Sequence, residues 1–140
     1  MTIPLLVGKG ALRVRDVGQR VVVSFFSRYC RPCFRELPIL YRVVRAANKG
    51  RDAKRKIAFI VIAADGQPPP AFLKQLGNDA RWLIDHSGVA AAAFRPRRFP
   101  CTYIAKDGKI AKINRGFGSG YGARVARWLS QVFPRAKRAP

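Results

Sequence analysis

The chain has 140 residues, of which 49% are hydrophobic, and its 28 basic against 7 acidic residues give a formal net charge of +21. This length and composition fit one globular domain and argue against an extended disordered chain. No apolar run reaches the ~20 residues that span a bilayer, and the start, MTIPLLVGKG, lacks the features of a signal peptide. We expect a single domain over residues 1–140, with a core of about 18–133 and a basic tail at 134–140.

The positive charge is spread through every segment of the chain, including the surfaces of the predicted helices. A field of this strength attracts nucleic acid, an anionic membrane surface or acidic proteins without choosing among them. The plainer interpretation is that the arginines and lysines form solvated faces and follow the Arg-, Ala- and Pro-rich composition of the whole chain. The scattered placement favours this plainer interpretation.

The first half of the chain predicts strand, helix and strand. After an irregular or hairpin lead-in at 5–19, the apolar run Val21–Phe26 predicts a strand buried on both faces. The segment 34–48, FRELPILYRVVRAAN, has helical spacing of apolar residues and contains Pro38, which removes one helical hydrogen bond. The run Ile57–Ala63 predicts a second buried strand.

The second half continues the alternation and then changes period. Short helices are expected near 70–77 and 88–94, with a strand at RWLID between them, so that parallel strands are covered on both faces. Asp107-Gly108 lies between two alternating stretches and predicts a β-hairpin. The segment 121–133 predicts an amphipathic C-terminal helix. The expected fold class is therefore α/β, with a mixed central sheet, helices on both faces, and a C-terminal hairpin and helix.

Cys30 and Cys33 are spaced three residues apart, directly behind the first buried strand. At a helix start, Cys30 would face unpaired N–H groups that favour a thiolate, while Cys33 would lie one turn into the helix. Pro32 suits the first helical turn, and Arg31 adds positive charge beside the sulfur. A disulfide between the two cysteines closes so small a loop that it would stabilise the fold little, which favours thiol–disulfide exchange over a structural role.

The segment around these cysteines resembles the thioredoxin superfamily, and within it the TlpA-like bacterial thiol:disulfide oxidoreductases. The resemblance lies in CxxC followed by Cys-x-x-Glu-x-Pro-x-Leu, here Cys33, Glu36, Pro38 and Leu40. It extends in order over about residues 18–116, through WLIDHSGVAAAAF and FRPRRFPCTYIAKDGKI. The family has a thioredoxin fold, so the same fold is expected here.

The resemblance implies roles for three residues. Cys30 would be the attacking thiolate and Cys33 the resolving thiol. Pro100 would be a cis-proline that faces the CxxC motif, pairs with a substrate strand and keeps metal away from the sulfurs. No cofactor is implied beyond the redox-active Cys30–Cys33 pair.

The chain also departs from the family. Ser24 stands where thioredoxins have a buried aspartate that assists the resolving cysteine, and Asp65 is a weaker candidate for that task because a loop Asp before Gly is common turn chemistry. Tyr29 replaces the usual tryptophan. Phe99 is bulkier than usual and would narrow the substrate groove, and Cys101 replaces the usual threonine.

Two other interpretations remain open. Cys30, Cys33, Cys101 and His86 together have the composition of a zinc site, although a single CxxC motif is poor evidence for one. Cys101 is otherwise expected as a small buried strand residue and His86 as a turn residue. The chain would alternatively be a basic thioredoxin-like binding module for nucleic acid, a ribonucleoprotein or an acidic protein, with an idle dithiol.

The sequence thus predicts a monomeric thiol:disulfide oxidoreductase. We expect it to act as a protein disulfide reductase, and the arginines around the cysteines leave oxidase and isomerase roles open. Its expected partners are protein disulfide or dithiol substrates and an upstream thiol reductant. The resemblance favours the periplasm or cell envelope, while the chain carries no targeting signal, which keeps a cytoplasmic location as the alternative.

Overall fold

Five strands form the central sheet of this computed structural model, which describes residues 18–135 and the backbone of residues 2–4 and 11–13. The strand order is β5-β4-β3-β6-β7, built from β3 (Arg20–Phe26), β4 (Ala58–Ala63), β5 (Arg81–Ile84), β6 (Cys101–Lys106) and β7 (Lys109–Arg115). Strands β3, β4 and β5 are parallel, whereas β6 runs antiparallel to β3 and pairs with β7. The sheet is mixed, as the sequence predicted.

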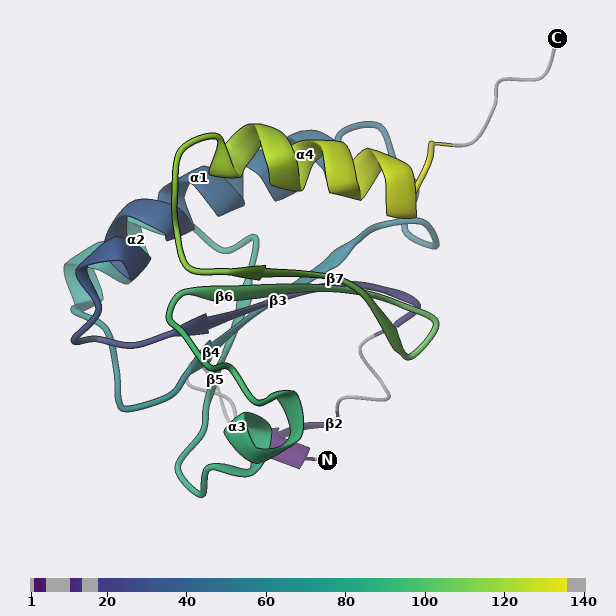
Figure 1. Cartoon of the computed structure of the whole chain (residues 1–140). Helices are drawn as coiled ribbons and strands as arrows, with labels where there is room; N and C mark the ends of the chain where they lie inside the picture. Colours follow the sequence, from purple (N-terminus) through teal and green to yellow (C-terminus); the bar gives the residue numbers. More distant parts are fainter. Residues whose placement is uncertain (1, 5–10, 14–17, 136–140) are drawn as a thin grey trace, which may run out of the picture.

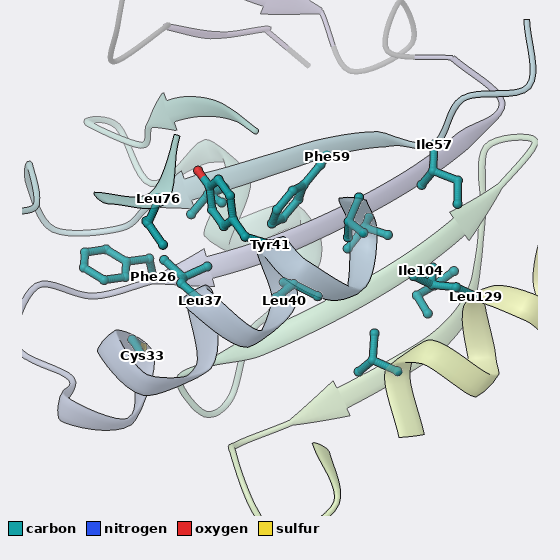
Figure 2. Packing of buried hydrophobic residues seen from close by; sticks show 14 of the residues in the cluster. Phe26, Cys33, Leu37, Leu40, Tyr41, Ile57, Phe59, Leu76, Ile104 and Leu129 are labelled. Carbon is teal, nitrogen blue, oxygen red and sulfur yellow. The ribbon is translucent and has the colours of Figure 1, made fainter. Parts of the chain in front are cut away.

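Helices cover both faces of this sheet (Figure 1). Helix α1 (Arg31–Asn48), α2 (Pro70–Leu76) and α4 (Tyr121–Val132) lie on one side, and the short α3 (Val89–Phe94) lies on the other. Each side has its own hydrophobic cluster, the larger one beneath α1 and α4. Figure 2 shows Cys33, Leu37 and Leu40 on the side of α1 that faces the sheet.

Local sequence explains where the main elements begin and end. Pro32 occupies the first turn of α1, where no helical hydrogen bond is lost, and Asn48 ends the helix by exchanging two side-chain hydrogen bonds with the backbone of Ile57. Asp107 and Gly108 both have positive φ, of 52° and 81°, as a two-residue hairpin turn requires. Only Ala90 is buried in helix α3, although four of its six residues are alanines.

The two ends of the chain differ from the expectations in detail. At the front, β1 (Thr2–Pro4) pairs antiparallel with β2 (Ala11–Arg13), so the expected hairpin starts earlier than residue 5, while residues 5–10 and 14–17 lie outside the described part. At the back, Arg135 donates a hydrogen bond to the carbonyl of Ala46, so the tail begins with a residue tied to α1, and residues 136–140 lie outside the described part.

Within residues 18–135 and the two short N-terminal strands, no helix has the length and apolar character needed to cross a membrane.

Candidate active site

Cys30 lies at the N-cap of α1 and is partly exposed. Its backbone is extended, and its sulfur accepts a hydrogen bond from the backbone N–H of Cys33 at 3.3 Å. This contact satisfies one of the N–H groups that a helix start leaves unpaired. The sulfur therefore occupies the position at which a negative charge is stabilised by the helix end.

Cys33 lies one turn into α1 and is fully buried. Burial and a hydrogen bond with Cys30 raise the pKa of the Cys33 thiol well above its ordinary value. Both sulfurs are free thiols, so the structure shows the reduced pair. The two cysteines thus divide into an accessible sulfur and a buried sulfur that holds its proton.

A buried carboxylate lies on the same helix face, three residues beyond Cys33. Glu36 is fully buried, and its Oε2 accepts hydrogen bonds from the hydroxyls of Ser24 (3.5 Å), Thr102 (3.2 Å) and Tyr121. Thr102 and Tyr121 also lie within hydrogen-bonding distance of each other, at 2.9 Å. Strands β3 and β6 and helix α4 therefore all contribute to one polar cluster beneath the cysteines.

Glu36 has one oxygen with no protein partner. Its Oε1 is buried and accepts no hydrogen bond within the described residues. Burial raises the pKa of Glu36 from its usual 4.5 to about 7, although the three hydroxyls act in the opposite direction. Glu36 and the Cys33 thiol also interact electrostatically, since the carboxylate contributes to the raised pKa of Cys33. A carboxyl group that titrates near neutral pH is thus coupled to the buried thiol.

Asp65 lies elsewhere in the site and has a different environment. It is exposed, and it accepts hydrogen bonds from the Ser27 hydroxyl and, at 3.0 Å, from the backbone N–H of Arg28. These contacts hold the turn that leads into Cys30. The structure places Asp65 as a turn-stabilising residue, while the buried carboxylate near Cys33 is Glu36.

The surface around Cys30 is aromatic and basic. Tyr29 is 78% exposed, and the guanidinium of Arg28 lies 5.5 Å from the centre of its ring. Arg31, Pro32 and Arg35 are exposed on the first turns of α1. The exposed surface beside Cys30 at the start of α1 is therefore positively charged.

The Phe99–Pro100 peptide bond is cis. Pro100 is buried, and its carbonyl accepts a hydrogen bond from the N–H of Gly116 at 2.7 Å, which ties it to the end of β7. Phe99 is partly buried and packs against the hydrophobic clusters on both sides of the sheet.

The four residues of the zinc interpretation are not brought together. Cys101 packs in the cluster beneath α3, on the sheet face opposite to Cys33, and His86 is exposed in a turn. No group of three or more potential metal-ligating side chains occurs in the described part of the chain. The separation of Cys101 from Cys33 by the sheet removes the geometric basis for that interpretation.

Sequence reasoning missed the cluster around Glu36. The sequence motif contains Glu36, but it does not connect Glu36 with the hydroxyls of Thr102 and Tyr121, and Ser24 stands out only as the replacement of an aspartate. The available signals were a serine within the apolar run of β3 and a threonine at its register partner on β6. Two adjacent small hydroxyls on a buried sheet face indicate a polar group opposite them.

No family model and no curated protein matches the chain. Several solved structures are similar to it. A structure of DsbF from MTB, in mixed oxidised and reduced forms, aligns with a TM-score of 0.76 and 18% identity over 94% of both chains. A secreted Mycobacterium tuberculosis disulfide oxidoreductase homologous to E. coli DsbE aligns with a TM-score of 0.72 and 18% identity, covering 94% of this chain and 95% of that one.

A third structure, the pneumococcal exposed lipoprotein thioredoxin from Streptococcus pneumoniae, aligns with a TM-score of 0.67 and 22% identity, covering 92% of this chain and 98% of that one. The alignments extend over almost the full length of each chain, and they agree with the mixed five-stranded sheet and its helices. The chain therefore has the thioredoxin fold.

Proposed function

We propose that this chain is a thiol:disulfide oxidoreductase that acts as a protein disulfide reductase. The observation that carries the proposal is the asymmetry of the two sulfurs: Cys30 is partly exposed at a helix N-cap, and Cys33 is buried one turn behind it. Exchange chemistry needs this arrangement, because one sulfur must reach the substrate and the other must displace it. The disulfide oxidoreductase named among the similar structures adds support from fold likeness.

The proposed reaction has two steps. The Cys30 thiolate attacks one sulfur of a substrate disulfide, which forms a mixed disulfide and releases the other substrate sulfur as a thiolate. Cys33 then loses its proton and attacks the Cys30 sulfur, which forms the Cys30–Cys33 disulfide and releases the reduced substrate. An upstream thiol reductant returns the pair to the dithiol form.

Proton removal from Cys33 is the difficult part of this sequence, because its thiol is buried and its pKa is raised. We assign the proton acceptor to Glu36, whose own pKa of about 7 suits it to hold a proton transiently at neutral pH. We expect Pro100 and Phe99 to border the dithiol, and the exposed Tyr29 and Arg31 to contact the substrate.

We further propose that residues of about 18–133 act as one domain and that the chain works as a monomer. The strands and helices from Arg20 to Phe133 share two clusters on either side of one sheet, which supports a single cooperative unit. Sedimentation at increasing protein concentration tests the monomer, and a mass that doubles with concentration would contradict it.

Trapping tests the catalytic proposal. A Cys33→Ser variant retains the attacking sulfur and should accumulate mixed disulfides with protein substrates, while Cys30→Ser should accumulate none. A redox titration of the wild type against glutathione should show one two-electron transition. A chain that trapped nothing and showed no such transition would instead be a binding module with an idle dithiol.

A further inference from the structure

The positive charge of this protein is largely unmatched by acidic side chains. Arg45 and Asp79 form an ion pair at 2.5 Å, and it is the only ion pair among residues 18–135. The chain as a whole has 28 basic and 7 acidic residues. Most of the cations therefore have no internal counter-charge.

A cavity of about 830 Å³ gathers several of these cations at the end of the molecule away from Cys30. It lies between the C-terminal half of α1, the loop that follows, and the starts of β4 and β5. Its floor includes Ile57, Phe59 and Ile60. Among its lining residues Asp79 is the one acid, and the basic ones are Arg42, Arg45, Lys49, Arg51, Lys56 and Arg81.

Backbone carbonyls hold Arg51, which lines the cavity, and Arg135 at this end of α1. Arg51 donates to the carbonyls of Ala47 (2.7 Å) and Phe133 (2.5 Å), and Arg135 donates to that of Ala46 (3.0 Å). Carbonyls at a helix C-terminus position cations in this way but leave their net charge in place. Burial together with the nearby Arg135 and Arg20 lowers the pKa of Arg51, as expected where like charges crowd.

We propose that this cavity binds the sugar–phosphate backbone of a single-stranded nucleic acid. Arg42, Arg45 and Lys49 follow one another at helical spacing along α1, which spreads their charges over about 10 Å of helix axis. One strand of a nucleic acid in a stacked, helical conformation presents about three phosphates over such a length. Arginine adds a planar fork of donors that matches phosphate oxygens.

The shape and lining of the cavity further restrict the kinds of ligand that it can bind. A concave site of this size holds a single strand and offers no flat contact to a bilayer surface. Phe59, the aromatic residue of the lining, is buried, so no exposed ring is available for base stacking. Contacts to phosphate without contacts to bases carry no sequence information, so binding should be independent of sequence.

The site is independent of the dithiol. Helix α1 has 18 residues, so its length of about 27 Å separates the Cys30 end from the cavity end. Nucleic-acid binding and disulfide exchange can therefore succeed or fail separately. Each of the two proposals can be rejected without the other.

Fluorescence anisotropy with labelled single-stranded RNA of mixed sequence, measured over a range of salt concentrations, tests the site. The cavity variant Arg42→Gln/Lys49→Gln/Lys56→Gln should bind on the order of tenfold more weakly at low salt and lower the slope of log K against log salt by about 2. The control Lys74→Gln/Lys109→Gln/Arg127→Gln removes the same charge from exposed positions outside the cavity lining and should retain most of the affinity.

A gain-of-function variant separates loss of the binding site from misfolding, because a misfolded protein would not bind RNA more tightly at this site. Asp79→Asn removes the acid that competes for Arg45, so it should bind the RNA more tightly than the wild type. Equal losses in the cavity and control variants, or no gain with Asp79→Asn, would overturn the proposal. Equal competition by a poly-glutamate peptide would also overturn it, as would preferential binding to vesicles that contain anionic lipid.

Discussion

Tyr121, the first residue of α4, donates a hydrogen bond from its hydroxyl to the Oε2 of Glu36, which lies 85 residues earlier in the chain. Both side chains are buried, and the contact joins the C-terminal helix to the helix that carries the cysteines. The C-terminal helix thus reaches the carboxylate beneath the dithiol. The protonation of Glu36 can therefore be altered by a substitution at Glu36 itself or by one at Tyr121.

Replacing Glu36 by Gln should slow the second step of exchange and leave the first step unchanged. The amide cannot accept the proton of Cys33, so decay of the mixed disulfide should slow by about 100-fold. The rate of this decay should also lose its dependence on pH with a midpoint near 7. Stopped-flow measurement of mixed-disulfide formation and decay on a peptide disulfide separates the two steps. Asp65→Asn is the matched control and should keep the midpoint; an unchanged decay rate in Glu36→Gln would refute the assignment.

Tyr121→Phe should move that midpoint to higher pH. The hydroxyl of Tyr121 stabilises the ionised form of Glu36, so its removal raises the pKa of the carboxyl above about 7. The pH dependence of mixed-disulfide decay measures the shift. Tyr41→Phe removes a buried hydroxyl that accepts a hydrogen bond from Trp82 and is not one of the hydroxyls bonded to Glu36, so it should lose comparable stability without moving the midpoint.

The free energy of unfolding should depend on pH through Glu36. Between pH 4.5 and about 7 the folded chain keeps a proton on Glu36 that the unfolded chain releases, so stability should fall as pH rises through this range. The loss should be about 3 kcal/mol, and stability should level off above pH about 7.

Urea unfolding of the wild type and Glu36→Gln across this range isolates the contribution. At low pH, where Glu36 is protonated, the free energies of unfolding of the two proteins should differ by a constant amount. Toward neutral pH the wild type should lose stability relative to Glu36→Gln. Parallel curves would show that Glu36 has no raised pKa in the folded protein.

Gly122→Ala should destabilise the contact between α1 and α4. A Cβ at Gly122 would lie 2.9 Å from the Cγ2 of Ile39, and this methyl group cannot move aside without a change of rotamer in a β-branched side chain. We expect a loss of about 1–3 kcal/mol in the free energy of unfolding, despite the better helix propensity of alanine. Gly118→Ala is the control, because nothing lies within 4 Å of its Cβ position, and thermal melting compares the two.

Much of the fold followed from short-range patterns. The apolar run before Cys30 became β3, Pro32 lies in the first turn of α1, and Asp107-Gly108 forms the hairpin turn between β6 and β7. Each of these features depends on residues close together in the chain, through periodicity or through backbone preferences of proline and glycine. Such signals can be recognised without knowing what packs against them.

The electrostatic features of the site could not be recognised in that way. In the sequence, Ser24 stands out only because thioredoxins have an aspartate at this position. In the structure, its hydroxyl donates a hydrogen bond to Glu36. Asp65 was the candidate carboxylate, but it stabilises the turn before Cys30. The burial of Glu36 near the dithiol depends on the packing of β3, β6 and α4 around α1. It therefore cannot be predicted from any short segment of the sequence.

The sequence by itself determined the order of strands and helices, the placement of Cys30 and Cys33 at a helix start, and the large excess of positive charge. Only the tertiary structure decided that Glu36 is buried among Ser24, Thr102 and Tyr121, and that cations from α1, β5 and the loop after α1 line one cavity. The physical reason is that secondary structure follows from local backbone preferences and hydrophobic periodicity. Burial of a carboxyl group and crowding of like charges follow instead from contacts between segments far apart in the chain.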